Sequence, residues 1–248
     1  MQASEPGLND VRAQHPEQNL LLRALPAEEY GRLSVHFQLV VLEVKQVISE
    51  PNQPITDVYF PRRGMISLLA VDRGGGAVEV GTIGNEGMTG LPIFHGIDST
   101  PHRCVTQVAG AAVCISAADF RSALPELSVL SALLHRYTVS AFNDAAQSAA
   151  CNRLHSVEKR CARWLLMTDD RVEGSEFLLT QEFLAYMLGT PRPAVSVACN
   201  RLQRTGLIQY SRARIRVLDR VGLEAVSCDC YRITRSSRDA VFAIPEPG

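Results

Sequence analysis

Residues 180–208 read TQEFLAYMLGTPRPAVSVACNRLQRTGLI, which is two short helical patterns on either side of Gly189-Thr190-Pro191. In each pattern the apolar residues recur at the spacing of one helix face: Leu184, Met187 and Leu188 in the first, and Val195, Ala198, Cys199 and Leu202 in the second. Gly189 suits the positive φ of a sharp helix-to-helix turn, and Thr180 and Thr190 are candidate N-caps. The stretch predicts a helix-turn-helix, with a helical hairpin inside a core as the alternative.

The charge around this stretch favours nucleic-acid binding. The whole chain has a net charge of −1, but residues 180–220 carry seven arginines and two acidic residues, a net charge of +5. A basic patch of this kind is what a nucleic-acid surface requires. After Gly206, two short strand runs flank Arg212-Ala213-Arg214, which predicts a β-hairpin wing with arginines at its tip. A solvated charged edge without a partner is the alternative for these arginines.

The chain upstream of this stretch changes character twice. Residues 19–35 have helical spacing broken by Pro26, and residues 37–118 are short apolar runs separated by turn signals, typical of a β roll or sandwich. The fold class expected is α+β. Its expected divisions are a flexible N-terminus (1–18), a β-roll sensor domain (19–124), a dimerisation helix (125–154), a winged helix-turn-helix (155–225) and a C-terminal tail (226–248) without a functional interpretation.

A long helix is expected over residues 126–153. At 1.5 Å per residue it would span roughly 42 Å, which is long for a domain of this size to bury alone. An apolar seam in steps of three and four predicts that it pairs with the same helix of a second subunit: Leu127, Leu130, Leu134, Tyr137 and Ala141. The alternative is a helix packed under the β roll of its own subunit.

Composition argues against several other classes of protein. There is no apolar run of membrane-spanning length and no signal-peptide pattern in the polar N-terminus, so a cytoplasmic location without a membrane partner is expected. Of seven cysteines none forms a CxxC pair, and the close pair Cys228 and Cys230 lacks two further ligands nearby in the sequence, so neither a metal nor a cofactor is expected. The role of these two cysteines stays open.

An enzyme is not expected either. An enzyme or metabolite-binding protein built on the β roll, with an appended DNA-binding domain, is the alternative function. As a metal-dependent enzyme it would need a constellation such as HxH, whereas the six histidines are isolated from one another. Gly74-Gly75-Gly76 reads as a hairpin turn and not as a phosphate loop, because no Lys-Ser/Thr follows. A nonspecific architectural DNA binder is a third interpretation.

A β roll, a long helix and a winged helix in this order resemble the Crp/Fnr family of bacterial transcription regulators over about residues 19–225. The resemblance rests on residues 58–61, 77–80 and 84–88 and on a set of helix-turn-helix residues. That set is Thr180, Leu184, Leu188, Gly189, Arg192, Val195, Leu202 and Gly206-Leu207-Ile208. It implies a homodimer whose recognition helices enter successive major grooves of double-stranded DNA, at half-sites about 34–36 Å apart in an inverted repeat. A regulator of transcription also implies RNA polymerase as a partner.

The residues that would face DNA follow from the second helix. Opposite its core face lie Pro193, Val197, Asn200 and Arg204, with Ser196 at the edge. Arg192 matches the family's guanine-reading arginine, whereas Pro193 and Val197 replace polar base-reading residues of its best-known members, so a different DNA sequence is expected. Phosphate contacts, which position without specifying, are expected from Thr180, Thr190, Arg212 and Arg214.

The family's effector site is altered in this chain. Its Gly-Glu pair, which holds the ribose, aligns with Thr89-Gly90, and its Arg-Ser or Arg-Thr pair, which holds the phosphate, aligns with Arg103-Cys104. The resemblance therefore implies an effector pocket at these four residues that does not bind cyclic AMP tightly. The first cysteine is Cys104, so the N-terminal iron–sulfur cluster of the oxygen-responsive branch is not expected, and His95 and His102 are interpreted as loop residues and not as haem ligands.

Overall fold

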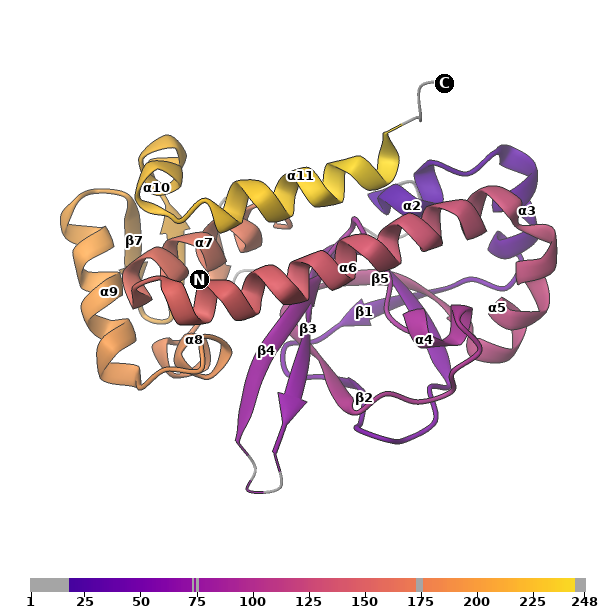
Figure 1. The fold of residues 1–248 in the computed structure, drawn as a ribbon, viewed down its shortest axis with the longest axis horizontal. Helices are drawn as coiled ribbons and strands as arrows, with labels where there is room; N and C mark the ends of the chain where they lie inside the picture. Colours follow the sequence, from indigo (N-terminus) through magenta and orange to yellow (C-terminus); the bar gives the residue numbers. More distant parts are fainter. Residues whose placement is uncertain (1–17, 73, 75, 173–175, 244–248) are drawn as a thin grey trace, which may run out of the picture.

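The computed structural model describes residues 18–72, 74, 76–172 and 176–243. Along the chain it has two short helices, a β roll, one long helix and a winged helix-turn-helix, and a last helix returns along the long one (Figure 1). The expected α+β class, with a β roll, a long helix and a winged helix-turn-helix in this order, is confirmed. Residues 1–17 of the expected flexible N-terminus lie outside the described residues.

The first helices are α2 (Leu20–Arg23) and α3 (Ala27–Ser34), and the buried polar side chain of Asn19 joins α2 to the roll. Asn19 caps α2, because its Oδ1 accepts from the backbone N–H groups of Leu21 and Leu22. Its amide donates to Pro61 O at 2.9 Å and to Gly87 O at 2.8 Å. Every polar atom of this buried side chain is thereby satisfied, as burial requires.

The β roll is one antiparallel sheet whose strands run in the order β1 (Gln38–Leu42), β5 (His102–Ser116), β3 (Asp57–Val71), β4 (Ala77–Ile83), with β2 (Val47–Ser49) also paired to β5. The hairpin of β3 and β4 points away from α6, on the side of the roll that lies next to α8 (Figure 1). Two short helices, α4 (Leu91–Phe94) and α5 (Ala117–Ala123), lie at the other end of the molecule.

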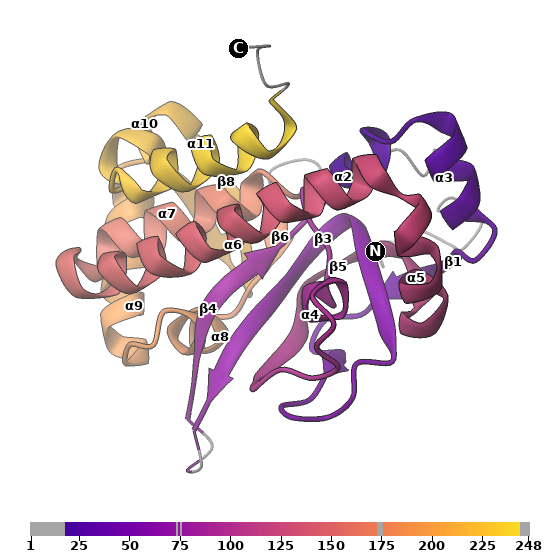
Figure 2. The ribbon, with the colours of Figure 1, turned by 45° about the vertical axis from the view of Figure 1, so that its right-hand side comes forward.

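The long helix α6 (Ser128–Leu154) crosses the roll and continues, after a break at His155-Ser156, as α7 (Val157–Asp169). The last helix, α11 (Cys230–Phe242), lies along α6 in both views (Figures 1 and 2). Ser237 on α11 hydrogen-bonds Ser140 and Asn143 on α6. Residues 226–243 are therefore a packed element of the fold and not a tail.

The expected dimer seam lies inside the protomer. Leu127, Leu130, Leu134 and Tyr137 are buried in one cluster with Phe60, Met88 and other residues of the roll, and Ala141 is half-buried against the roll. The expectation that these five residues pair with a second subunit is wrong. Their spacing correctly predicts an apolar helix face. The protomer's own roll covers that face, and this arrangement is the alternative given for the helix above.

The opposite face of α6 carries a second series in steps of three and four, of which all seven members are exposed: Ala132, His135, Val139, Phe142, Ala146, Ala149 and Arg153. Val139 and Phe142 are 60% and 72% exposed and lie one turn apart, so they form an apolar patch on this face. This face is called the outer α6 face below. Among the described residues, Phe94 and His95 contact it at His135, and its other members stay exposed.

The winged helix-turn-helix consists of α8 (Gln181–Met187), α9 (Arg192–Arg204) and α10 (Arg220–Val226), with a small sheet in the order β6 (Glu176–Leu178), β8 (Arg214–Val217), β7 (Ile208–Ser211). Its core is continuous with the roll, because Met65 and Leu69 of β3 belong to the same buried cluster as Trp164, Leu184 and Val195. The two parts therefore pack as one body.

Candidate DNA-binding surface and effector cavity

The turn between α8 and α9 is built by local backbone chemistry. Thr180 caps α8, with its Oγ1 accepting from Phe183 N at 3.1 Å, as expected. Gly189 has φ +55°, the left-handed conformation that ends α8. Thr190 is not the N-cap of α9: its N–H donates to Ala185 O at 3.0 Å, and Pro191 occupies the cap position with its φ already at −58°.

Helix α9 presents one face to the core and the other to solvent. Val195, Ala198, Cys199 and Leu202 are buried, as the spacing predicts. On the opposite face Arg192, Pro193, Val197, Asn200 and Arg204 are exposed, and Ser196 is half-buried at the edge. The structure thus brings all six expected base-facing residues onto one accessible helix surface, the arrangement that major-groove reading needs.

The wing is a tight hairpin whose two turn residues, Arg212 (φ +49°) and Ala213 (φ +63°), are both left-handed. Positive φ at both central residues is the type I′ turn that matches strand twist. Arg212 is exposed at this tip, whereas Arg214 Nη1 lies 3.1 Å from Glu176 Oε1 on β6. Such an exposed pair is worth little energy and leaves Arg214 available to exchange partners.

Not every arginine of the basic stretch belongs to this surface. Arg220 is bound by Asp169 Oδ2 and Asp170 Oδ1, each at 2.5 Å, and by the hydroxyl of Tyr231 at 2.6 Å. Its role is to join α10 to the end of α7. Its acidic partners lie about 50 residues upstream, outside residues 180–220. The net charge of that stretch therefore counts Arg220 as part of the basic patch, although its charge is compensated.

A cavity of about 460 Å³ lies between the roll and α6 and is lined mainly by apolar side chains, including Ile48, Leu68, Val80, Ile83 and Met88. Thr89, Gly90 and Cys104 line it, as expected. Arg103 does not: its Nε lies 2.8 Å from Glu50 Oε2, in a half-exposed ion pair. Successive side chains of a strand point to opposite faces, so with Cys104 in the cavity its neighbour faces away.

The arginine of the cavity comes instead from α11. Arg238 lines it together with Glu86 and Asp144, and its Nη1 lies 4.0 Å from Glu86 Oε1. Sequence reasoning missed this residue because the C-terminal segment was read as a tail. The spacing of Tyr231, Thr234, Arg238 and Val241 is that of one helix face and could have indicated a packed helix here. All four residues are buried in the structure.

Glu86 is ion-paired beneath the cavity with Arg171, which follows the end of α7. Arg171 Nη2 lies 2.5 Å from Glu86 Oε1, and Arg171 Nη1 donates to Met167 O at 3.1 Å. Burial raises the pKa of Glu86, but the Arg171 guanidinium overcomes that effect and lowers this pKa to about 2. The pair connects the roll to the segment that enters the winged helix.

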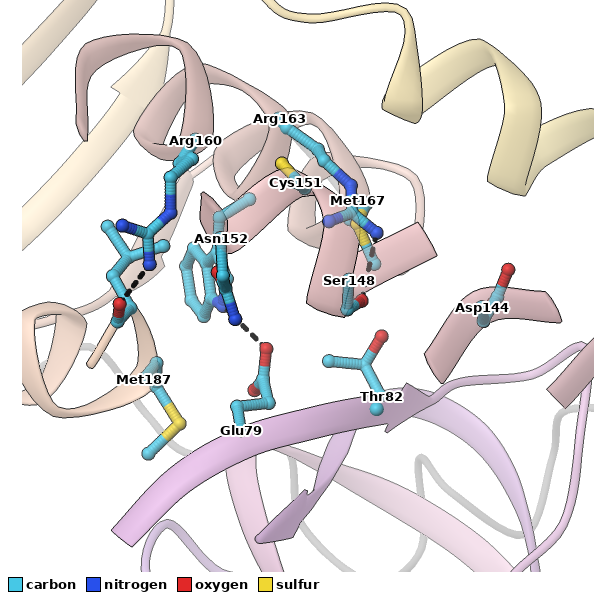
Figure 3. A pocket seen from close by; sticks show the side chains of 13 residues that line it. Glu79, Thr82, Asp144, Ser148, Cys151, Asn152, Arg160, Arg163, Met167 and Met187 are labelled. Atoms are coloured by element: carbon cyan, nitrogen blue, oxygen red, sulfur yellow. Dashed lines mark hydrogen bonds between the residues drawn. The ribbon is translucent and has the colours of Figure 1, made fainter. Parts of the chain in front are cut away.

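A second carboxyl group, half-buried, lies in a small pocket between β4, α6, α7 and α8 (Figure 3). Glu79 accepts from Trp164 Nε1 at 3.1 Å and from Ser67 Oγ at 2.7 Å. Desolvation in this pocket raises the pKa of Glu79 to about 7. In the same pocket Arg160 donates to Leu188 O, at the end of α8. Side chains of the roll and of α7 thus meet beside the helix-turn-helix.

No helix among the residues that the structure describes has the combination of length and apolarity needed to cross a membrane.

Comparisons with known proteins agree with this architecture. Residues 159–226 match the model of the Crp-like helix-turn-helix domain. A transcriptional regulator of the Crp/Fnr family from Eubacterium rectale has 18% sequence identity and a TM-score of 0.64, with 84% of this chain and 98% of that chain covered. FixK2 from Bradyrhizobium japonicum has 15% identity and a TM-score of 0.66, with 77% and 98% covered. TTHA1359, a Crp/Fnr regulator from Thermus thermophilus, has 20% identity and a TM-score of 0.59, with 77% and 98% covered.

No curated protein matches the sequence. The family match lies on the elements that carry the exposed α9 surface, and the structural likeness extends over the roll and α6. The chain therefore has the fold of the Crp/Fnr transcriptional regulators and carries a Crp-like helix-turn-helix DNA-binding domain at residues 159–226.

Proposed function

We propose that this protein is a sequence-specific transcription regulator, and not an enzyme, that acts in the cytoplasm and binds an inverted-repeat DNA site as a homodimer. The observation that carries the proposal is the outer surface of α9, where Arg192, Asn200 and Arg204 are exposed beside the arginine-tipped wing. A helix that presents polar side chains in this way is suited to the major groove. RNA polymerase is the partner through which such a regulator acts.

Within this surface the residues divide by the kind of contact they make. Arg192, at the start of α9, reads guanine through O6 and N7, and Val197 contacts a thymine methyl group. Thr180, Thr190, Arg212 and Arg214 contact phosphates and set the position of the helix. Pro193, Ser196, Asn200 and Arg204 complete the surface that faces the bases. Since Pro193 and Val197 offer no hydrogen-bond donor, the preferred half-site is expected to depend on shape and methyl groups at these positions.

The homodimer forms through the outer α6 face. Its spacing is that of a coiled-coil seam, and its alanines allow two helices to approach closely around Val139 and Phe142. A second copy of the same helix is the partner that fits, because a two-fold axis pairs one self-complementary seam with itself. Residues 19–124 are the sensor domain, 125–154 the dimerisation helix and 155–225 the DNA-binding domain, with α11 as a brace along the dimerisation helix.

The sensor cavity is not suited to cyclic AMP. Thr89-Gly90 supplies no carboxylate for a ribose, and Arg103 is engaged by Glu50 outside the cavity. Loss of charged hydrogen bonds of this kind costs about 1.5–3 kcal/mol each. Isothermal titration calorimetry with cyclic AMP is therefore expected to show no saturable binding in the micromolar range. Micromolar binding that disappears in Arg238→Met, in the cavity, would contradict this part of the proposal.

Selection of bound fragments from random DNA, followed by binding measurements at one fixed salt concentration, tests the DNA-binding proposal. An inverted repeat with half-sites about one helical turn apart is expected. Arg192→Ala should cost about 1–3 kcal/mol per contact and relax the preference at one base pair of each half-site. Arg121→Ala, which removes an exposed arginine of α5, is the matched control and should bind as the wild type does.

Two results would count against it. Equal affinity for selected and bulk DNA would indicate a nonspecific architectural protein, because the ratio of the two affinities is the measure of specificity. Unchanged base preference in Arg192→Ala would remove this residue from the reading surface.

A further inference from the structure

Four side chains with metal-binding atoms meet where α6 ends. Cys151 and His155 are one helical turn apart at the C-terminal end of α6, Cys228 lies between α10 and α11, and Cys230 is the first residue of α11. The three Sγ atoms and a ring nitrogen of His155 all lie within 4.8 Å of one another. The two halves of this group are 77 residues apart in sequence, measured from Cys151 to Cys228.

Two of the distances within the group are close to those around one tetrahedral ion. Cys151 Sγ and Cys228 Sγ are 3.5 Å apart, and Cys230 Sγ is 3.4 Å from His155 Nδ1. Around Zn²⁺, with Zn–S of about 2.3 Å and Zn–N of about 2.0–2.1 Å, tetrahedral angles place neighbouring ligand atoms roughly 3.5–3.8 Å apart. Three cysteines and one histidine are also a ligand set of structural zinc sites.

The surroundings suit a closed site. Cys151, Cys228 and Cys230 are 1–3% exposed and form a small cluster of their own, separate from the large apolar clusters. Gln147 Nε2 lies 3.0 Å from Cys230 Sγ, as a donor that supports a ligand from outside the coordination sphere.

The charge around the group is also favourable. Three thiolates and a neutral imidazole around a divalent ion leave a net charge of −1. Arg160 and Arg163 on α7 are close enough for their guanidinium groups to interact electrostatically with Cys151. The site therefore contains its ligands, a supporting donor and cations that compensate the remaining charge.

We propose that Cys151, His155, Cys228 and Cys230 bind one Zn²⁺ ion that joins the end of α6 to the link between α10 and α11. Zn²⁺ fits because thiolates and imidazole favour it, whereas Mg²⁺ and Ca²⁺ require oxygen ligands. On binding, each thiol that is protonated releases its proton to solvent, and four coordinate bonds form without any change of oxidation state. The ion acts as a structural cross-link, and its binding does not depend on what the winged helix recognises.

Full-length protein stripped of metal with a chelator under reducing conditions is the material for the test. We expect one equivalent of Zn²⁺ to bind in competition with a chromophoric chelator. We expect one equivalent of Co²⁺ to give the visible absorption of a tetrahedral ion and a thiolate-to-cobalt charge-transfer band. Cys151→Ser and Cys228→Ser should each weaken Zn²⁺ binding at least about 100-fold, since loss of a supporting residue alone costs about 10–100-fold.

Two further variants keep the test decisive. Cys114→Ser, on β5, removes a buried thiol remote from the site and should retain full Zn²⁺ affinity. His155→Gln removes a half-buried ligand and leaves the buried thiols in place, so folding should persist while the Co²⁺ spectrum changes. The proposal fails if reduced wild-type protein binds no stoichiometric Zn²⁺, or if Cys228→Ser binds Zn²⁺ as tightly as wild type does.

Discussion

Glu79 shows how much one half-buried carboxyl group can influence this fold. It lies on β4 and accepts hydrogen bonds from Trp164 on α7 and from Ser67 on β3. Burial raises its pKa from 4.5 to about 7, so the folded protein holds a proton that the unfolded chain releases. A group with a raised carboxyl pKa contributes stability that is fully present below pH 4.5 and is lost as the pH rises to about 7.

Glu79→Gln should therefore flatten the pH dependence of stability between pH 4.5 and 7. The amide keeps an acceptor for Trp164 and cannot ionise, so the variant should gain on the order of 3 kcal/mol relative to wild type over this interval. Urea unfolding at a series of pH values measures the effect. The exposed Glu182→Gln is the control and should keep the wild-type slope; an unchanged slope in Glu79→Gln would show that this carboxyl group does not titrate in the interval.

Single residues were also where sequence reasoning was least complete. Local spacing placed the buried and exposed faces of α9 correctly, because both depend only on neighbours one or two turns away. It could not tell that Arg220 is bound by Asp169 and Asp170, or that Arg103 faces away from the cavity. Those outcomes depend on partners distant in sequence and on the register of a strand.

At the scale of the element, α6 is a helix with two apolar stripes on opposite sides. Both stripes repeat in steps of three and four, so periodicity alone cannot assign one to the roll and the other to a second subunit. The more aliphatic stripe is buried in the protomer, and the stripe richer in alanine is exposed. Sequence therefore predicted the helix and its bounds closely, but it assigned the dimer contact to the stripe that the roll of the same protomer covers.

Val139→Asp should weaken self-association roughly 100-fold, because a symmetric seam would bury two carboxylates without partners. The protomer should remain folded, since this side chain is 60% exposed within it. Sedimentation equilibrium or light scattering gives the association constant, and circular dichroism checks the fold. Val35→Asp, at an exposed valine after α3, is the matched control and should stay dimeric; a dimeric Val139→Asp would move the contact to another surface.

At the scale of the whole molecule, the Arg171–Glu86 pair joins three parts of the chain that are far apart in sequence. It connects the roll to the end of α7, and Arg238 of α11 lies beside it. The two partners are 85 residues apart, so no local pattern could have predicted the pair. The Cys₃His group at the end of α6 escaped the sequence for the same reason.

Arg171→Met should destabilise the protein by about 3–5 kcal/mol, because it leaves Glu86 buried without its main cation. The double variant Arg171→Met/Glu86→Leu should lose less than the sum of the two single variants, since it removes both charges together. Urea unfolding of the four proteins completes the double-mutant cycle. Strict additivity would mean that the two groups do not stabilise each other.

Strand β4 lies between the cavity and the turn of the helix-turn-helix, and it contacts both. Residues 80–83 of this strand line the cavity, and Val78 lies against the turn of the helix-turn-helix so closely that a Cβ on Gly189 would be 3.0 Å from Val78 Cγ2. If a small molecule in the cavity displaces the strand, we expect the position of that turn, and with it the affinity for DNA, to change. Thermodynamic reciprocity requires DNA to alter the affinity for the small molecule by the same factor. A cavity ligand would then have two dissociation constants, one for the free protein and one for the DNA-bound protein.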